Sequence, residues 1–226
     1  MNIQEKLARA ENYGGTRSLA DIRYLVIHFT ANNGDTAKNN ADYFAREAAG
    51  ASAHYFVDEN EVWLSVPDSR TAWHCGTTGT YFHPYCRNKN SIGVELCSRK
   101  DANGVYYFTG ETVGRAVQLV RQLRAQYGIP QGNILRHYDV THKVCPEPFV
   151  RNAGAWQKFV EAAEQEDEEM TIYKTYEDCP DWAKETVKKL VHLGYLHGDE
   201  QGILNLEHNM LRGLVINDRA GLYDRT

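Results

Sequence analysis

Two short apolar runs, each ending in a histidine, constrain the fold of this chain more than any other feature. The first run covers residues 24–28 (YLVIH) and the second covers residues 133–137 (NILRH). Such runs favour β-strands, so His28 and His137 are each predicted to lie at a strand end. Cys145 follows eight residues after His137, in a loop restrained by Pro146. Two strand ends and a loop can meet at one point, which predicts a shared site for these three side chains.

The residue types at this site predict a catalytic zinc. Such a zinc takes three protein ligands and keeps a fourth position open for water. Imidazole and thiolate donors, as in His28, His137 and Cys145, suit zinc better than calcium or magnesium. Zinc lowers the pKa of bound water to about 7, but a neighbouring base must still manage the protons.

Glu95 is the candidate base and Lys143 the candidate oxyanion-stabilising group. Glu95 lies in a run of small and apolar residues, 90–96 (NSIGVEL), and burial there would raise the pKa of its carboxyl group toward a useful value. Lys143 is two residues before Cys145, where its ammonium group could face a carbonyl oxygen that gains charge. The alternative for both residues is an ordinary solvent-exposed position, on a strand for Glu95 and in a loop for Lys143.

Five segments of the chain together form a specific pattern. They are residues 26–30 (VIHFT), 52–58 (SAHYFVD), 72–76 (AWHCG), 90–95 (NSIGVE) and 137–146 (HYDVTHKVCP). These segments resemble zinc-dependent N-acetylmuramoyl-L-alanine amidases, a superfamily that includes phage amidase-type lysozymes, bacterial wall amidases and peptidoglycan recognition proteins. The resemblance covers roughly residues 20–160 in family order. It implies hydrolysis of the amide between the lactyl group of muramic acid and the L-alanine of the stem peptide in bacterial peptidoglycan.

The resemblance also implies a role for each matched residue. It implies that the ligands of Zn²⁺ are His28, His137 and Cys145. It further implies that Glu95 is the catalytic glutamate and that Lys143 is the lysine of the ligand loop.

The chain departs from some phage members at one position. Those members place a catalytic tyrosine just before the histidine that matches His54, whereas this chain has Ala53 there and Tyr55 follows. A tyrosine-based mechanism is therefore not expected, which strengthens the case for Glu95. The expected substrate-binding residues, with internal packing as the alternative, are His54, Trp73 and His74.

Two other activities compete with amide hydrolysis at muramic acid. A binding-only relative of the peptidoglycan recognition type would hold its ligand without cutting it, but such relatives typically lack the cysteine that Cys145 matches. A metallopeptidase would cut within the stem peptide by similar metal chemistry. The chain has no His-Glu-x-x-His motif, the commonest metallopeptidase signature.

The order of predicted elements indicates an α/β fold, with a central mixed β-sheet flanked by helices and the zinc site at strand ends. Helices are predicted at residues 36–49, 110–127 and 153–164, and two further strands at 53–58 and 61–66. Gly50 and Gly128 are the expected helix stops. A long irregular loop is expected over residues 67–90, and such loops usually carry function.

An acidic run separates two predicted domains. Residues 164–169 (EQEDEE) cannot be buried, so 164–171 is predicted to link a catalytic domain, 1–163, to a small, mostly helical module, 172–226. Residues 176–198 of the module resemble a single S-layer-homology repeat, which implies a role at the wall. A core this small supplies little stability, so a lone copy is expected to dock on the catalytic domain or on another copy. A wall-binding or homodimer-forming role is the hypothesis that follows.

Charge and hydropathy limit the partners and the location. A net charge of −5 argues against general nucleic-acid binding. The sequence contains no span of about 18 apolar residues, so no transmembrane helix is predicted. The polar amino terminus carries no signal-peptide core. We therefore expect synthesis in the cytoplasm and action on the wall after lysis or holin-type release, as in a phage or prophage endolysin.

The five cysteines cannot all pair with one another, and Cys145 is the expected unpaired residue. In a reducing cytosol Cys75, Cys86 and Cys97 are expected to be small semi-buried thiols, although they could pair after release into an oxidising medium. A second zinc site built from His74, Cys75, His83 and Cys86 is disfavoured, because their spacing matches no closed structural-zinc pattern.

Overall fold

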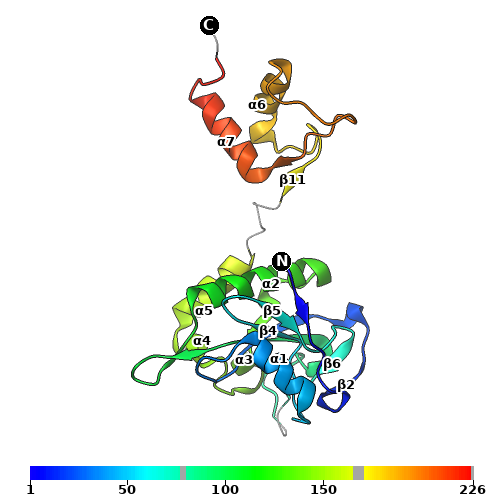
Figure 1. Ribbon diagram of the computed structural model, residues 1–226, viewed down its shortest axis with the longest axis vertical. Coiled ribbons are helices and arrows are strands. Elements are labelled where there is room, and N and C mark those ends of the chain that lie inside the picture. The colour runs from blue at the N-terminus through cyan, green and yellow to red at the C-terminus, as the bar shows by residue number, and fades with distance from the viewer. Residues whose placement is uncertain (77–79, 165–170, 225–226) are drawn as a thin grey trace. The chain divides into compact units, whose positions relative to one another are not determined.

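The computed structural model describes residues 1–76, 80–164 and 171–224, which belong to two compact units (Figure 1). The first unit is Met1–Glu164 and the second is Gln165–Thr226. Most of the predicted acidic linker, residues 165–170, lies outside the described residues. Within the described part of the chain, no helix combines the length and the apolar character that a membrane span requires.

A mixed β-sheet forms the centre of the first unit, as predicted. Among the described residues it has six strands in the order β1-β5-β4-β7-β3-β10. The neighbouring strands are all parallel except for the antiparallel pair β4 and β5. The strands are β1 (Gln4–Glu5), β3 (Tyr24–Phe29), β4 (Tyr55–Val57), β5 (Val62–Leu64), β7 (Ser91–Leu96) and β10 (Ile134–Arg136). Two small ladders pair β2 (Tyr13–Thr16) with β6 (Arg70–Ala72) and β8 (Arg99–Lys100) with β9 (Tyr106–Tyr107).

Helices cover both faces of this sheet. Figure 1 shows α2 and α5 together on one side, with α1 and α3 on the other. The helices are α1 (Ala37–Arg46), α2 (Gly110–Tyr127), α3 (His137–Thr141), α4 (Glu147–Arg151) and α5 (Ala153–Glu164). Short 3₁₀ turns are η1 (Ala10–Asn12), η2 (Leu19–Asp21), η3 (Asn88–Asn90) and η4 (Gln131–Asn133). The predicted end of α2 is confirmed, since Gly128 adopts the left-handed conformation at φ +62°.

The alternation of side chains along β3 decides which way His28 points. Leu25 and Ile27 belong to the main core, which also contains Leu119 of α2 and Phe159 of α5. Successive residues of a strand face opposite sides, so His28 faces the other side of the sheet. Because both faces are covered, β3 is apolar along nearly its whole length, which is typical of a central parallel strand.

Helix α1 is shorter than the prediction of residues 36–49. Thr36 begins it as an N-cap whose hydroxyl accepts the amide of Asn39 at 3.0 Å. The helix ends at Arg46, and the next segment turns toward Asn12, whose Oδ1 accepts the amides of Ala49 at 2.7 Å and Gly50 at 3.2 Å. This tertiary contact, and not the glycine stop at Gly50, ends the helix.

Two further expectations are corrected. The segment 67–90 is not wholly irregular, because it contains β6, which pairs with β2, and the 3₁₀ turn η3, which precedes β7. The strand predicted to close at His137 ends at Arg136, and His137 is the first residue of α3. Asp139 causes this change, since its carboxylate accepts the backbone amide of Arg136 at 2.8 Å and begins a helical turn.

The second unit is small and mostly helical, as expected. Helices α6 (Asp181–His192) and α7 (His208–Arg219) pack against a ladder of β11 (Ile172–Tyr173) and β12 (Leu206–Glu207). Its core contains side chains from each helix and from β12. These include Cys179, Val187, Leu206, Leu211 and Val215.

Candidate metal centre

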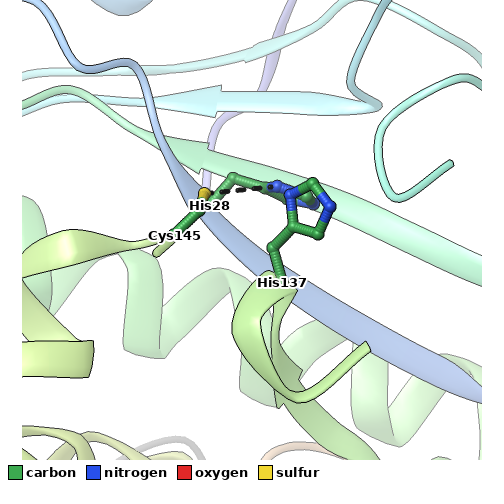
Figure 2. Close-up of side chains that lie close together, drawn as sticks. All are labelled: His28, His137 and Cys145. Atoms are coloured by element: carbon green, nitrogen blue, oxygen red, sulfur yellow. Dashed lines mark hydrogen bonds between the residues drawn. The ribbon is translucent and has the colours of Figure 1, made fainter. Parts of the chain in front are cut away.

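Three elements bring the predicted zinc ligands together (Figure 2). His28 comes from β3, His137 begins α3, and Cys145 lies in the loop before α4. Their donor atoms all lie within 4.8 Å of one another, and the three side chains are buried. Cys145 Sγ is 3.7 Å from His28 Nδ1.

The spacing and the unsatisfied donors of this cluster fit zinc. Tetrahedral zinc, with bonds of about 2.0–2.1 Å to nitrogen and about 2.3 Å to sulfur, separates its ligand atoms by roughly 3.3–3.6 Å. Within the described chain, both ring nitrogens of His137 are buried without a hydrogen-bond partner. An unsatisfied buried polar group costs about 1–3 kcal/mol, and a bound metal would remove that cost for the one nitrogen that it binds.

Burial keeps both histidines neutral, which is their metal-binding form. Burial, with smaller contributions from His137 and His74, holds the pKa of His28 well below its ordinary value. Burial and the charge of Lys143 lower the pKa of His137 to about 4. Burial and the nearby Glu95 raise the pKa of the Cys145 thiol to about 12, so metal binding at neutral pH would release a proton from this residue.

Glu95 lies directly beside His28 in the sheet. The two residues are register partners on the neighbouring parallel strands β7 and β3, so their side chains share one face. Oε2 of Glu95 is buried and has no hydrogen-bond partner among the described residues. Burial raises the pKa of this carboxyl group to about 7, with Lys143 opposing the increase and Asp35 adding to it. A carboxyl group with this pKa can both take up and release a proton near neutral pH.

Lys143 is exposed in the loop that leads to Cys145. The amide of Cys145 donates to the carbonyl of Lys143 at 2.7 Å, which tightens the loop beside the ligands. The lysine charge lowers the pKa of Glu95, His28 and His137. A positive charge therefore lies within electrostatic range of the ligands and of the candidate base.

The three predicted substrate-binding residues lie in different environments. Trp73 is 38% exposed and presents its indole to solvent. His54 is fully buried, and its Nδ1 accepts the amide of Gly93 at 3.0 Å. His74 is half-buried, with its Nδ1 3.0 Å from Nε2 of His28. The structure thus brings His74 to the metal centre and surrounds His54 with protein groups, while substrate contact by these residues stays a prediction.

Residues that the sequence interpretation did not single out also surround the site. Arg17 donates to the carbonyls of Asp68 at 2.7 Å and Ser91 at 2.6 Å, and so fastens the start of β7. Ser91 and Gly93 both contact His74. A glycine inside a strand often marks a close approach of another group, so Gly93 could have indicated this contact from the sequence. No sequence pattern indicated Arg17 or Ser91.

Three residues of the disfavoured second zinc site have other surroundings in the structure. His83 Nδ1 accepts the amides of Tyr85 at 3.2 Å and Cys86 at 2.9 Å, while Cys75 and Cys86 lie in an apolar cluster. In the part of the chain that the structure describes, one group of three or more metal-binding side chains occurs, the cluster of Figure 2. All five cysteines are free and buried.

Comparison with known proteins agrees with this geometry. The family model described as N-acetylmuramoyl-L-alanine amidase matches residues 18–148. The amidase CwlL of Bacillus licheniformis is 34% identical over 176 residues, which cover 74% of this chain and 48% of that protein. The chain spans about half the length of the curated relatives it matches.

Solved structures share the fold of the first unit. The structure of PlyL superposes with a TM-score of 0.61 at 27% identity, covering 73% of this chain and 98% of that one. A mutant endolysin from Bacillus subtilis gives a TM-score of 0.58 at 26% identity, covering 72% of this chain and 99% of that one.

Proposed function

Because the chain belongs to the N-acetylmuramoyl-L-alanine amidase family, we propose that it hydrolyses the amide between N-acetylmuramic acid and the L-alanine of the peptidoglycan stem peptide. The observation that carries the proposal is the convergence of His28, His137 and Cys145 beside Glu95, whose Oε2 has no hydrogen-bond partner in the described part of the chain. In the reaction the bond from the lactyl carbonyl carbon to the alanine nitrogen breaks. Water supplies a hydroxyl group to that carbon and a proton to that nitrogen.

Zinc is the proposed cofactor, held by the three buried donors. When bound, it acts as a Lewis acid that polarises the carbonyl group and lowers the pKa of water. The chain's own contribution is to bring together two neutral imidazoles, from β3 and from the start of α3, and the thiol of Cys145 in the loop before α4, which would lose its proton on binding the metal.

Glu95 is the proposed general base and acid. Its Oε2 has no partner among the residues that the structure describes, and a pKa of about 7 lets the carboxyl group take a proton from the attacking water. The same carboxyl group then gives a proton to the departing alanine nitrogen. Burial is essential to this role, because an ordinary glutamate with a pKa near 4.3 would be a poor proton donor at neutral pH.

Lys143 is the proposed oxyanion-stabilising residue. Its ammonium group can approach the carbonyl oxygen as negative charge develops there. The effect of its charge on Glu95, His28 and His137 supports a place beside the reacting groups. Trp73, with its exposed indole, is the proposed contact for the glycan or the stem peptide, together with the predicted residues His54 and His74.

We propose that the second unit directs the enzyme to the wall or joins two copies of it. It carries a cavity of about 510 Å³ that combines an indole, which can stack on a sugar, with guanidinium groups, which can pair with anions. The residues that line this cavity are Trp182, His208, Arg212, Val215, Ile216 and Arg219. Deleting residues 171–226 should weaken wall binding or convert a dimer to a monomer, as judged by light scattering against the mass of one truncated chain. A truncated protein with unchanged wall binding and an unchanged number of chains per particle would exclude both roles.

The endolysin-type location is likewise a proposal. We infer that the enzyme meets peptidoglycan after lysis or passage through a holin-type pore, since its first unit is similar to the mutant endolysin from Bacillus subtilis. Its proposed partner is bacterial peptidoglycan and not nucleic acid.

The proposal is tested by digesting purified peptidoglycan with the zinc-loaded protein and identifying the newly exposed groups by mass spectrometry. We expect new L-alanine amino termini without new reducing sugars, and their loss in Glu95→Ala at equal zinc content. Intact wall that is bound but uncut would favour the peptidoglycan recognition type. Cuts within the stem peptide would favour a metallopeptidase.

A further inference from the structure

A chain of hydrogen bonds leads from His28 away from the metal centre and into the sheet. Nε2 of His28 is 3.0 Å from Nδ1 of His74. Nε2 of His74 is 3.1 Å from Oγ of Ser91, and that hydroxyl donates to the carbonyl of Arg87 at 2.7 Å. None of these partners belongs to the proposed ligand set.

The last bond of the chain sets the direction of all the others. A carbonyl oxygen only accepts, so the single hydroxyl proton of Ser91 points to Arg87. Oγ of Ser91 must then accept from Nε2–H of His74. A neutral imidazole has one donor and one acceptor nitrogen, so Nδ1 of His74 accepts. Nε2 of His28 is consequently the protonated nitrogen, and Nδ1 of His28 carries the free lone pair.

That lone pair is on the side of the ring where the metal is proposed. Nδ1 of His28 is the nitrogen that lies 3.7 Å from Cys145 Sγ. We infer that Ser91 and His74 form a directional relay that fixes the tautomer and orientation of His28, so that Nδ1 is its metal-binding atom. His74 is thus a positioning residue for the metal centre. The inference rests on the proposed function only in taking the cluster of Figure 2 as a metal site.

The sheet makes a space for this relay at Gly93. A Cβ atom on Gly93 would lie 2.5 Å from Cγ of His74 and within 2.9 Å of two further ring atoms. Any other residue at that position of β7 would therefore displace the imidazole. The ring also lies edge-on to His28, with centroids 5.1 Å apart. The close packing and the hydrogen bonds thus hold His74 in one orientation behind the ligand.

A partner of this kind has a measurable effect on metal binding. Groups that accept the second ring N–H of a ligating histidine fix its tautomer and raise its basicity, and their loss typically costs 10- to 100-fold in metal affinity. Removing the Ser91 hydroxyl leaves His74 in place, but Nε2–H of His74 loses its acceptor. The loss of metal affinity should therefore be smaller, roughly two- to tenfold.

The first test uses the unaltered protein. Long-range ¹H–¹⁵N NMR of histidine-labelled full-length protein at pH 7.5 distinguishes protonated, unprotonated and metal-bound ring nitrogens. Without metal we expect His28 and His74 to be protonated on Nε2, and with zinc we expect His28 to bind through Nδ1. His28 protonated on Nδ1, or zinc bound through its Nε2, would overturn the inference. If no zinc binds to the three ligands, the proposed function fails, while the metal-free spectrum still decides the direction of the relay.

The second test measures zinc affinity by competition with a chromogenic chelator. We expect a 10- to 100-fold loss in His74→Leu, a roughly two- to tenfold loss in Ser91→Ala, and substantial recovery in His74→Asn, whose side-chain oxygen can accept from His28. Ser65→Ala is the matched control, because Ser65 is also fully buried but its hydroxyl has no partner among the described residues. Wild-type affinity in a folded His74→Leu, or an equal loss in Ser65→Ala, would contradict the relay. If His74→Leu fails to fold, the spectra of the unaltered protein remain decisive.

Discussion

At the scale of single residues, Glu95 occupies a place where a negative charge is costly. Burial raises the pKa of its carboxyl group to about 7, from a value of 4.5 for an unperturbed glutamate. Between pH 4.5 and about pH 7, Glu95 is therefore protonated more in the folded state than in the unfolded state. The contribution of Glu95 to the free energy of unfolding is therefore greatest below about pH 4.5 and falls as pH rises through about 7.

A Glu95→Gln variant should remove this pH dependence. In metal-free protein, the unfolding free energy of the variant relative to wild type should increase by about 2–3 kcal/mol between pH 4 and pH 8. Urea denaturation with a chelator present measures the difference at each pH. Glu161→Gln, at an exposed position of α5, is the control. If the difference in unfolding free energy between Glu95→Gln and wild type does not change with pH, Glu95 is not held in a desolvated site.

Lys143 should affect turnover and not metal content. Removing a group that stabilises developing charge typically lowers kcat by about 10²–10³-fold, so we expect such a loss in Lys143→Ala and a partial recovery in Lys143→Arg. Release of L-alanine amino termini gives the rate, and atomic absorption gives the zinc content. Lys158→Ala, on the exposed side of α5, should behave as wild type. Unchanged turnover in Lys143→Ala would leave the residue as an ordinary loop lysine.

At the scale of elements, β7 combines two requirements at two positions of one face. Its residue Glu95 pairs with His28, while Gly93 gives His74 room to reach the same histidine. The strand must therefore be small at one position and carry a carboxylate two residues later on the same face. This explains why a central strand contains both a glycine and an acidic residue.

Gly93→Ala should weaken both stability and zinc binding. The added methyl group would meet the His74 ring at 2.5 Å, and overpacking of this kind typically costs about 1–3 kcal/mol. Displacement of His74 should also raise the dissociation constant for zinc. Gly114→Ala is the contrasting control, because Gly114 lies inside α2 with no atom near its Cβ position, and a gain of about 0.5–1 kcal/mol is expected. Thermal and urea unfolding, with zinc titration, distinguish the two variants. Equal effects of Gly93→Ala and Gly114→Ala on stability and zinc affinity would contradict the steric argument.

Long elements with clear periodicity were predictable, whereas short ones depended on tertiary contacts. Strands β3 and β7 and helix α2 follow from apolar runs and helical spacing. The early end of α1 depends on Asn12, which is distant in sequence, and β6 exists because it pairs with β2. The start of α3 at His137 depends on one side chain, that of Asp139.

The site was predictable to a similar degree. Residue types and family order identified the cluster of His28, His137 and Cys145. Its connection to His74 and Ser91 was not visible, because strand register and the direction of a side-chain hydrogen bond leave no periodic pattern in a sequence.

At the scale of the whole molecule, the chain consists of two units with separate cores. The prediction of a linker at residues 164–171 rested on the acidic run at residues 164–169, because such a run has no place in a packed core. The three proposed metal ligands all belong to the first unit. Metal binding should accordingly stabilise one unit and leave the other unaffected.

Calorimetry of the full chain should show two transitions, of which one responds to zinc. Zinc at about 1,000 times its dissociation constant contributes roughly 4 kcal/mol, which corresponds to about 10 °C for a unit of this size. Adding a chelator should lower the transition temperature of the first unit only. Cys145→Ser should remove most of the response, and Cys179→Ser, in the core of the second unit, should shift the other transition instead. A single transition that moves as a whole would contradict independent units.

The ligands come from opposite ends of the first unit's sequence, and this has a consequence for biosynthesis. His28 and Cys145 are 117 residues apart, and β10, which precedes His137, pairs with β3 only after most of the unit has been made. A nascent chain that stops before residue 145 lacks one of the three donors. The metal therefore cannot organise the early stages of folding. Its capture would instead mark the completion of the unit, with unfinished chains remaining metal-poor and inactive.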